Sequence, residues 1–345
     1  MKRIILALSI VIIGCATKTY QIGLHFIVDN FEYEVIGIKE LRLVCCNDTS
    51  SVVNIPTKIT HNGLTYKITA IGFEAFANKS NMTTVAIPKS VKSINTWAFH
   101  NCVNLTNFTI PKAVKHIEST AFHNTAFYNN KDNWTDNVLY KDGCLLSADT
   151  LLSGEYSIHK TTRLIASEAF SCCKKLISIT IPRSITTIRT GTFAGCESLK
   201  SITIPISVKN IEDNVFVGCS SLTSVELPNE IDWIAPYIFK DCSSLESITI
   251  PDNVNCIEVC AFENCKNLKQ VVIGSNVDTI VAFAFLNCNN LKTITCLAKE
   301  PPTLDGKDIF PNPNDITLLV PKGCKDKYIN SDWNKYFDGR IKEME

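Results

Sequence analysis

The sequence of 345 residues lacks an excess of charge of either sign, because 34 basic residues balance 34 acidic ones. A protein whose main partner is nucleic acid needs a concentrated positive surface, so this balance argues against nucleic acid as the partner. Glycine is also scarce, with 14 residues, and the motifs G-x-x-x-x-G-K-[ST], G-x-G-x-x-G, H-E-x-x-H and G-x-S-x-G do not occur. Their absence removes the commonest nucleotide-binding sites, zinc proteases and serine hydrolases from consideration.

Long hydrophobic runs are missing too. The longest, residues 4–13, follows a positively charged start and has about half the length that a membrane-spanning helix needs. It predicts an export signal over residues 1–15. The sequence Ile-Ile-Gly before Cys15 resembles a bacterial lipobox, which would make Cys15 a lipidation site and hold the protein at the cell surface or outer membrane. The segment 14–16 also fits an ordinary signal peptidase site, which would release a secreted protein; we favour the lipoprotein.

What the chain does contain is a repeat of 23 residues. Consecutive segments begin at Ile188, Ile211, Ile234, Ile257 and Ile280, and the same frame is found at Ile71, Ile94, Ile117 and Ile165. The five regular segments have phenylalanine at the sixth position, cysteine at the ninth and leucine at the twelfth. A fixed period of this size over more than half of the chain predicts a solenoid, mainly β with short helical or 3₁₀ turns.

One repeat shows why the coils must stack. Leu199, Ile202 and Ile204 alternate with small polar residues, which predicts a short strand with one apolar face, and Pro205 ends that strand. Phe216 then supplies bulk in a short turn. A single repeat cannot bury this apolar face alone, so its stability has to come from neighbouring coils about 4.8 Å away.

The repeat pattern I-x-x-x-A-F-x-x-C-x-x-L-x-x-I-x-I-P-x-x-V-x-x resembles the BspA-type leucine-rich repeats of bacterial surface proteins, most closely over 94–116 and 165–187. The sequence FEYEV over 31–35 is similar to the family's N-terminal hairpin region, and residues 301–333 are similar to its C-terminal end. The resemblance implies surface display and binding to host proteins or other cells, with no catalysis.

We therefore expect a right-handed curved array with an N-terminal hairpin cap and a C-terminal cap. The expected divisions are the signal peptide at 1–15, an N-terminal cap at 16–70, the solenoid at 71–296 and a C-terminal cap at 297–345. Within the solenoid, the stretch 126–164 departs from the repeat. Tyr328, Trp333 and Phe337 are expected to cover the last coil, because an uncapped solenoid would expose strand edges and apolar side chains.

Seven of the sixteen cysteines are expected to form a buried ladder of free thiols. They share one repeat position: Cys102, Cys173, Cys196, Cys219, Cys242, Cys265 and Cys288. Parallel Cβ vectors on neighbouring coils make disulfide geometry poor, whereas a small thiol suits a tight corner where a carbonyl needs a partner. His100 and His123 also share a position, but no third ligand is visible, so we expect a solvated pair and no metal.

The irregular stretch supplies the candidate binding residues Tyr128, Trp134, Tyr140 and Tyr156, because specificity tends to lie where a loop departs from its scaffold. The alternative is that these aromatics fill the core of two degenerate repeats. Lys141-Asp142-Gly143 predicts a hairpin turn in the same stretch. The exposed strand positions of the regular repeats carry mainly Ser and Thr and no Trp, Tyr or Arg, so we interpret that face as scaffold.

Three functions remain open from the sequence. The first is a non-catalytic surface protein, acting as a monomer without a cofactor, that binds a protein or glycan ligand. The second is a passive spacer at the surface. The third is an exported hydrolase, which would need an acid pair or a nucleophile with its base, and neither is visible.

Overall fold

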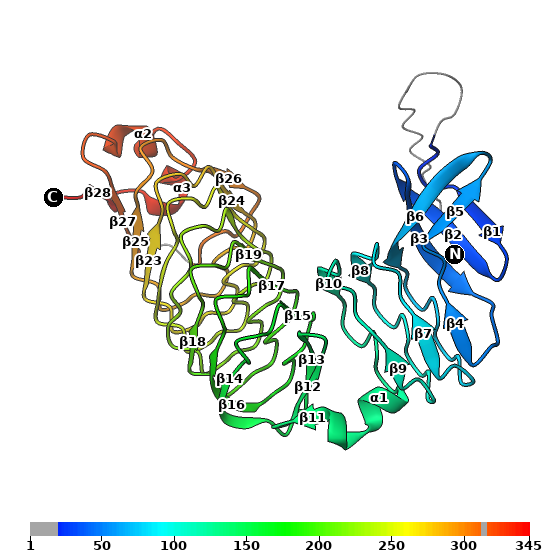
Figure 1. Ribbon diagram of the computed structural model, residues 1–345. Helices are drawn as coiled ribbons and strands as arrows, with labels where there is room; N and C mark the ends of the chain where they lie inside the picture. Colours follow the sequence, from blue (N-terminus) through cyan, green and yellow to red (C-terminus); the bar gives the residue numbers. More distant parts are fainter. Residues whose placement is uncertain (1–19, 312–315) are drawn as a thin grey trace. The chain divides into compact units, whose positions relative to one another are not determined.

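The computed structural model describes residues 20–311 and 316–345, so the predicted signal peptide and Cys15 lie outside the described residues. The chain forms two compact units. The N-terminal unit comprises Met1–Thr135 and Leu139–Leu146, and the C-terminal unit comprises Asp136–Val138 and Ser147–Glu345. Each unit is a stack of β coils, and together they hold about 13 turns, which confirms the predicted solenoid (Figure 1). No helix among the described residues has the length and apolar character needed to cross a membrane.

The N-terminal unit begins with six strands that pair partly antiparallel and partly parallel. They are β1 (His25–Val28), β2 (Phe31–Gly37), β3 (Glu40–Cys46), β4 (Val52–Asn54), β5 (Lys58–His61) and β6 (Leu64–Ile71). Alternate residues of β2 are buried, which gives the strand one apolar face. β5 and β6 form a hairpin whose two turn residues, Asn62 and Gly63, both have positive φ, as a type I′ turn requires.

The first coils extend this sheet directly. Parallel strands β8 (Ser93–Ile94) and β10 (His116–Ile117) follow β6 in the order β1-β2-β3-β6-β8-β10. A second sheet of the same unit has the order β4-β7-β9, with β7 (Thr84–Ala86) and β9 (Asn107–Phe108). The hairpin region therefore covers the first coil and supplies its strand partners.

The irregular stretch contains short elements of several kinds. They are α1 (Ala126–Asn129), the 3₁₀ helix η1 (Lys131–Asn133), β11 (Trp134–Thr135), β12 (Val138–Lys141), β13 (Cys144–Ala148), β14 (Ser153–Ser157) and β15 (Leu164–Ile165). Thr125 caps α1, because its Oγ1 accepts from the backbone N–H of Tyr128 at 3.1 Å. The hairpin turn predicted between β12 and β13 is confirmed: Asp142 and Gly143 both have positive φ, at 51° and 72°.

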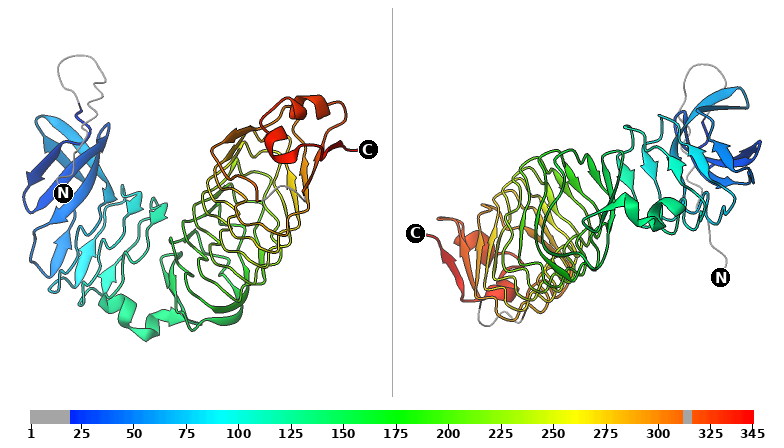
Figure 2. Two further views of the ribbon diagram at one scale, coloured as in Figure 1. Left: turned by 180° about the vertical axis from the view of Figure 1, so that it is seen from behind. Right: turned by 60° about the horizontal axis from the view of Figure 1, so that its bottom comes forward.

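The regular coils of the C-terminal unit each contribute up to two short parallel strands (Figure 2). They are β16 (Lys175–Thr180), β17 (Thr187–Ile188), β18 (Ser201–Thr203), β19 (Asn210–Ile211), β20 (Trp233–Ile234), β21 (Ser247–Thr249), β22 (Cys256–Ile257), β23 (Gln270–Ile273), β24 (Thr279–Val281) and β25 (Thr293–Cys296). Register follows the repeat, so that Ile188 pairs with Ile211 and Ile257 with Ile280. One sheet, β14-β16-β18, stops at β18, because residues 224–226 of the next coil form no strand.

Phenylalanines at the sixth repeat position form the centre of both units. Phe76, Phe99 and Phe122 stack in the N-terminal unit at 5.0 and 5.2 Å between ring centroids. A longer stack runs through the C-terminal unit, with neighbouring centroids 5.1–5.7 Å apart: Phe170, Phe193, Phe216, Phe239, Phe262, Phe285 and Phe310. Rings at these distances add pair attraction to the burial of their surface.

Six of the phenylalanine carbonyls lie beside a cysteine thiol of the next coil. The Cys219 Sγ donates to the Phe193 carbonyl at 3.2 Å, and Cys242 repeats the contact with Phe216 at 3.1 Å. Cys102, Cys196, Cys265 and Cys288 do the same in their coils, whereas Cys173 donates to Asp149 at 3.6 Å. All seven thiols are fully buried, and the fifteen described cysteines are free. The thiols therefore satisfy carbonyls that the coil corner leaves without a second donor.

The C-terminal end closes the stack. Its elements are β26 (Thr303–Asp305), β27 (Thr317–Val320), α2 (Lys325–Ile329), α3 (Asn334–Phe337) and β28 (Ile341–Glu343). Trp333 and Phe337 are fully buried against the last stacked ring, Phe310, with centroids 5.3 and 5.0 Å away. The Trp333 Nε1 donates to the Pro302 carbonyl at 2.8 Å, and the Tyr328 hydroxyl to the Ala298 carbonyl at 2.8 Å. The three aromatics therefore bury the final apolar surface while their polar atoms find partners.

Candidate binding surface

The fourth position of the repeat has left-handed backbone geometry in every regular coil. Its φ values lie between 55° and 63° at Glu74, Trp97, Thr120, Glu168, Gly191, Asn214, Tyr237, Cys260 and Phe283. Glycine and asparagine tolerate this geometry best, and a bulky side chain costs about 1–2 kcal/mol there. Trp97 is nevertheless 39% exposed, so burial does not compensate for that cost fully. An exposed tryptophan at this position points to a role outside folding.

Trp97 belongs to a continuous surface of rings that we call the aromatic strip. Its six members are Phe73, Trp97, His100, His123, Tyr128 and Trp134, all in the N-terminal unit. Successive centroids along that order lie 5.4, 6.0, 5.4, 5.0 and 5.2 Å apart. Phe73 is 54% exposed, and the other members are exposed or half-buried. A contiguous set of aromatic side chains that remains partly exposed to water is typical of an interaction site.

The irregular stretch fixes the end of the strip. Trp134 Nε1 donates to the Tyr128 carbonyl at 2.7 Å, and the two rings meet edge to face at 85°. Lys131 Nζ lies 4.7 Å from the centroid of the Trp134 ring, within the range of a cation–π contact. Tyr128 and Trp134 are therefore held in place by the capped helix α1 and by η1.

A row of amides borders the strip. Asn101 Nδ2 donates to Asn78 Oδ1 at 2.7 Å, Asn124 Nδ2 to Asn101 Oδ1 at 2.6 Å, and Asn129 Nδ2 to Asn124 Oδ1 at 2.8 Å. Asn78, Asn101 and Asn124 occupy the eighth repeat position, where φ is again positive. Asparagine tolerates this geometry, so the amide row follows from the repeat itself and gives the strip a polar edge.

The predicted histidine pair forms the middle of the strip. The His100 and His123 rings are stacked, with centroids 5.4 Å apart and an interplanar angle of 7°. Partial burial, and then the neighbouring His100, lower the pKa of His123 below its usual range. No group of three or more His, Cys, Asp or Glu side chains suited to a metal ion is present within 20–311 and 316–345.

The structure divides the four aromatics predicted to bind a ligand. It joins Tyr128 and Trp134 to the strip, whereas Tyr140 is half-buried in β12. Tyr156 is 9% exposed and lies against Phe170, with centroids 6.0 Å apart, so it belongs to the core. The core interpretation therefore holds for Tyr156.

Sequence reasoning missed Phe73 and Trp97 as surface residues. Phe73 holds a position where other coils carry mostly small or polar side chains, among them Thr96, Ser119, Ser167 and Thr190. The position of Trp97 is occupied by Thr120, Glu168, Gly191 and Asn214 in four coils, and by Tyr237 and Phe283 in two others. A comparison of repeat positions, rather than a search for irregular segments, would have found them.

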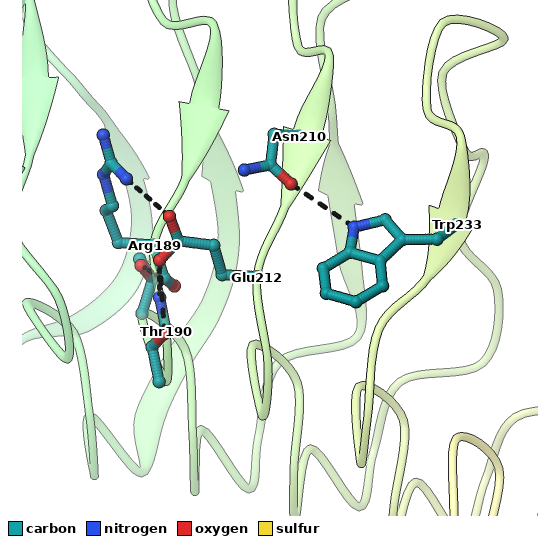
Figure 3. A network of polar contacts seen from close by, with 6 residues as sticks. Arg189, Thr190, Asn210, Glu212 and Trp233 are labelled. Atoms are coloured by element: carbon teal, nitrogen blue, oxygen red, sulfur yellow. Dashed lines mark hydrogen bonds and ion pairs between the residues drawn. The ribbon is translucent and has the colours of Figure 1, made fainter. Parts of the chain in front are cut away.

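The C-terminal unit has a polar network of a different kind (Figure 3). Glu212 accepts from Arg189 Nη1 at 2.5 Å and from the backbone N–H and the hydroxyl of Thr190 at 3.0 and 3.2 Å. Trp233 Nε1 donates to Asn210 Oδ1 at 3.5 Å. Arg189 is 8% exposed, and both oxygens of Glu212 are occupied by donors from the preceding coil. The network thus links neighbouring coils.

Comparison with known proteins identifies the repeat. The sequence profile of the family described as BspA type leucine rich repeat region matches residues 53–138 and 158–296 in six copies. Comparison with curated proteins found no significant match.

Solved structures give distant similarities. A leucine-rich repeat protein from Bacteroides ovatus is 24% identical, with a TM-score of 0.41 and coverage of 87% of this chain and 80% of that chain. One from Eubacterium ventriosum is 21% identical, with a TM-score of 0.48 and coverage of 82% and 93%. The pneumococcal vaccine antigen PcpA is 15% identical, with a TM-score of 0.37 and coverage of 93% and 97%.

The family profile covers well over half of the chain, and the residues that it matches include the coils paired in the 23-residue register. The chain belongs to the BspA-type leucine-rich repeat family.

Proposed function

We propose that this chain is an exported, surface-displayed binding protein without catalytic activity, and that the aromatic strip contacts its ligand. Membership of a repeat family of the surface type and the export signal predicted at 1–15 support display. The single observation that carries the binding proposal is the strip itself, six neighbouring rings of which Phe73 and Trp97 are 54% and 39% exposed.

The chemistry of the strip favours a protein ligand. Tryptophan and tyrosine are enriched among the residues that dominate protein interfaces, since they bury much area at a low entropic cost. Strip residues are already held by their mutual contacts and by the Trp134–Tyr128 hydrogen bond, so binding would order few side chains. The amide row at its edge supplies the polar rim that such interfaces have.

The test is binding of the purified protein, without its signal peptide, to an array of extracellular matrix proteins and to a glycan array. We expect saturable binding to a protein component. The variants Phe73→Ser and Trp97→Asn should each weaken it by at least about tenfold, which corresponds to about 1.4 kcal/mol.

Tyr237→Asn is the matched control, because Tyr237 occupies the same left-handed repeat position in the C-terminal unit, outside the strip. Its binding should equal that of the unmodified protein. Loss of binding in the control alone, or equal binding by all variants, would refute the strip as the contact surface. Saturable binding confined to glycans would replace the protein ligand by a sugar.

Display is tested separately by the intact mass of the native protein from membrane and medium fractions. A membrane-bound species that begins at Cys15 with added acyl mass supports lipid anchoring. An unmodified species in the medium would contradict display and leave the strip on a secreted protein.

A further inference from the structure

The C-terminal unit contains a second surface, unrelated to the strip, that has the character of a docking groove. A groove with a volume of about 720 Å³ lies just beyond the ends of β14, β16 and β18, in three successive coils. Its apolar lining consists of Ile158, Ile181, Pro182, Ile204, Pro205 and Ile206. The sheet stops at β18, and Ile204 is half-buried there, whereas its counterparts Ile181 and Ile250 are 4% and 1% exposed. The interruption of the sheet therefore uncovers apolar surface.

Ile206 differs in polarity from the residues at the same repeat position in other coils. It is 78% exposed, and the residues at its position in six other coils are Lys89, Lys112, Arg183, Asn229, Asp252 and Ser275. Every one of these is polar, so the fold does not need an apolar residue at this position. An isoleucine in water beside an apolar groove gains from burial only when something else covers it.

The charged side chains of the groove have one sign. Lys160 and Arg183 line it together with the hydroxyls of Ser157, Thr180, Ser184 and Thr203, and no acidic residue is among its described lining residues. The N-terminal unit has a smaller groove, of about 420 Å³, at the corresponding repeat positions. Its lining includes Ile55, Ile87, Pro88 and three lysines, and again no acidic residue is among the described lining residues. A partner that carries carboxylates would thus be matched in charge.

We propose that the groove beside Ile206 docks an extended, acidic segment of a partner protein. Aliphatic side chains of that segment enter between Ile181, Ile204 and Ile206, and its carboxylates pair with Lys160 and Arg183. The groove crosses three coils spaced about 4.8 Å apart, which corresponds to about three or four residues of extended chain at about 3.3 Å per residue.

The shape of the groove separates this occupant from a fatty acid, which shares the apolar and anionic chemistry. Sites for small molecules enclose about 70–90% of the ligand surface. This groove is partly open to solvent, so it would not enclose a lone acyl chain. The outer side of a peptide segment, by contrast, is covered by the partner to which it belongs.

The probe is a fluorescein-labelled hexapeptide of alternating aspartate and leucine, followed by fluorescence anisotropy on the protein without its signal peptide. Hexapeptides of alternating lysine and leucine, and of alternating aspartate and serine, test charge and apolar character in turn. We expect saturable binding of the aspartate–leucine peptide, weakened by added salt because the pairing charges are exposed. Ile206→Asp and Arg183→Glu should each reduce its affinity at least about tenfold, or about 1.4 kcal/mol.

Asn229→Asp is the matched control, since Asn229 holds the same repeat position one coil further on and does not line the groove. Ile206→Asp should leave the thermal midpoint unchanged, because the side chain is exposed and Asp252 occupies this position in another coil. Equal affinity of the Ile206→Asp variant, equal binding of the lysine–leucine peptide, or binding of sodium laurate without binding of the peptide would overturn the proposal. These outcomes do not depend on the aromatic strip, whose variants leave this groove intact.

Discussion

Trp97 and Phe99 lie two residues apart in the same coil and show two uses of an aromatic side chain. Phe99 is fully buried and stacks between Phe76 and Phe122, with centroids 5.0 and 5.2 Å away. Trp97 is 39% exposed on left-handed backbone and contacts Phe73 and His100 at 5.4 and 6.0 Å. The repeat needs a ring at the sixth position to fill its core, whereas the fourth position functions as well with glycine or asparagine. The stack is therefore part of the fold, and the strip is an addition to it.

The largest expected effect is the loss of stability when the buried ring of Phe99 is removed. Phe99→Ala removes a ring that contacts both neighbouring coils, and we expect it to lower the free energy of unfolding of the N-terminal unit by about 3–5 kcal/mol. Urea unfolding followed by circular dichroism measures the loss. Hydrogen exchange should show the loss of protection centred on 94–122, because each coil contacts only its neighbours. A loss below about 1 kcal/mol would mean that the stack is not the main source of stability.

The next effect concerns the thiols that accompany the stack. Burial raises the pKa of Cys102 to about 11 and that of Cys219 to about 12, and it raises the pKa of Cys196, Cys242 and Cys265 as well. Well below pH 9 the thiols are protonated in both the folded and the unfolded chain. As pH rises above 9 only the unfolded chain loses these protons, so stability should fall from pH 9 towards the folded pKa values.

Each such thiol contributes a slope of about 1.4 kcal/mol per pH unit. The variant Cys219→Ala should flatten the decline by that amount between pH 9.5 and 10.5, measured by urea unfolding in the presence of a reductant. Cys172→Ala is the control, because Cys172 is exposed and lies outside the buried ladder. Identical slopes for both variants would contradict a buried, protonated ladder.

The smallest effect on stability is expected when the exposed Trp97 is replaced. Trp97→Asn relieves the left-handed strain while it loses the contacts to Phe73 and His100, so the free energy of unfolding should stay level or rise by up to about 1 kcal/mol. The same urea titration used for Phe99→Ala measures it. A loss greater than about 2 kcal/mol would place Trp97 with the core and remove the physical basis of the strip.

Several features could be predicted from the sequence because they depend on local spacing. The sixth-position ring, the ninth-position thiol and the alternation of Leu199, Ile202 and Ile204 recur at a fixed period, and a period can be counted without a structure. The Asp142-Gly143 turn was equally local, since two residues with positive φ suffice to form it. The binding role of Tyr128 and Trp134 stays a prediction, now with a defined surface around them.

The strip could not be found in the same way, because its members occupy four different local settings. Phe73 and Trp97 hold the third and fourth repeat positions, the two histidines hold the seventh, and Tyr128 and Trp134 come from the irregular stretch. Only the stacking of three coils and the course of α1 and η1 bring these rings into contact. The groove beside Ile206 depends in the same way on a sheet that stops at β18.

The sequence by itself determined that this protein is a solenoid of stacked coils with a phenylalanine and a cysteine at the centre of each regular coil. Each repeat has the same apolar positions and can bury them only by stacking on its neighbours. The tertiary structure alone decided which aromatic side chains remain outside. Exposure depends on the neighbouring coil as well as on the residue: Tyr156 is covered by Phe170, whereas no coil covers Trp97 in full.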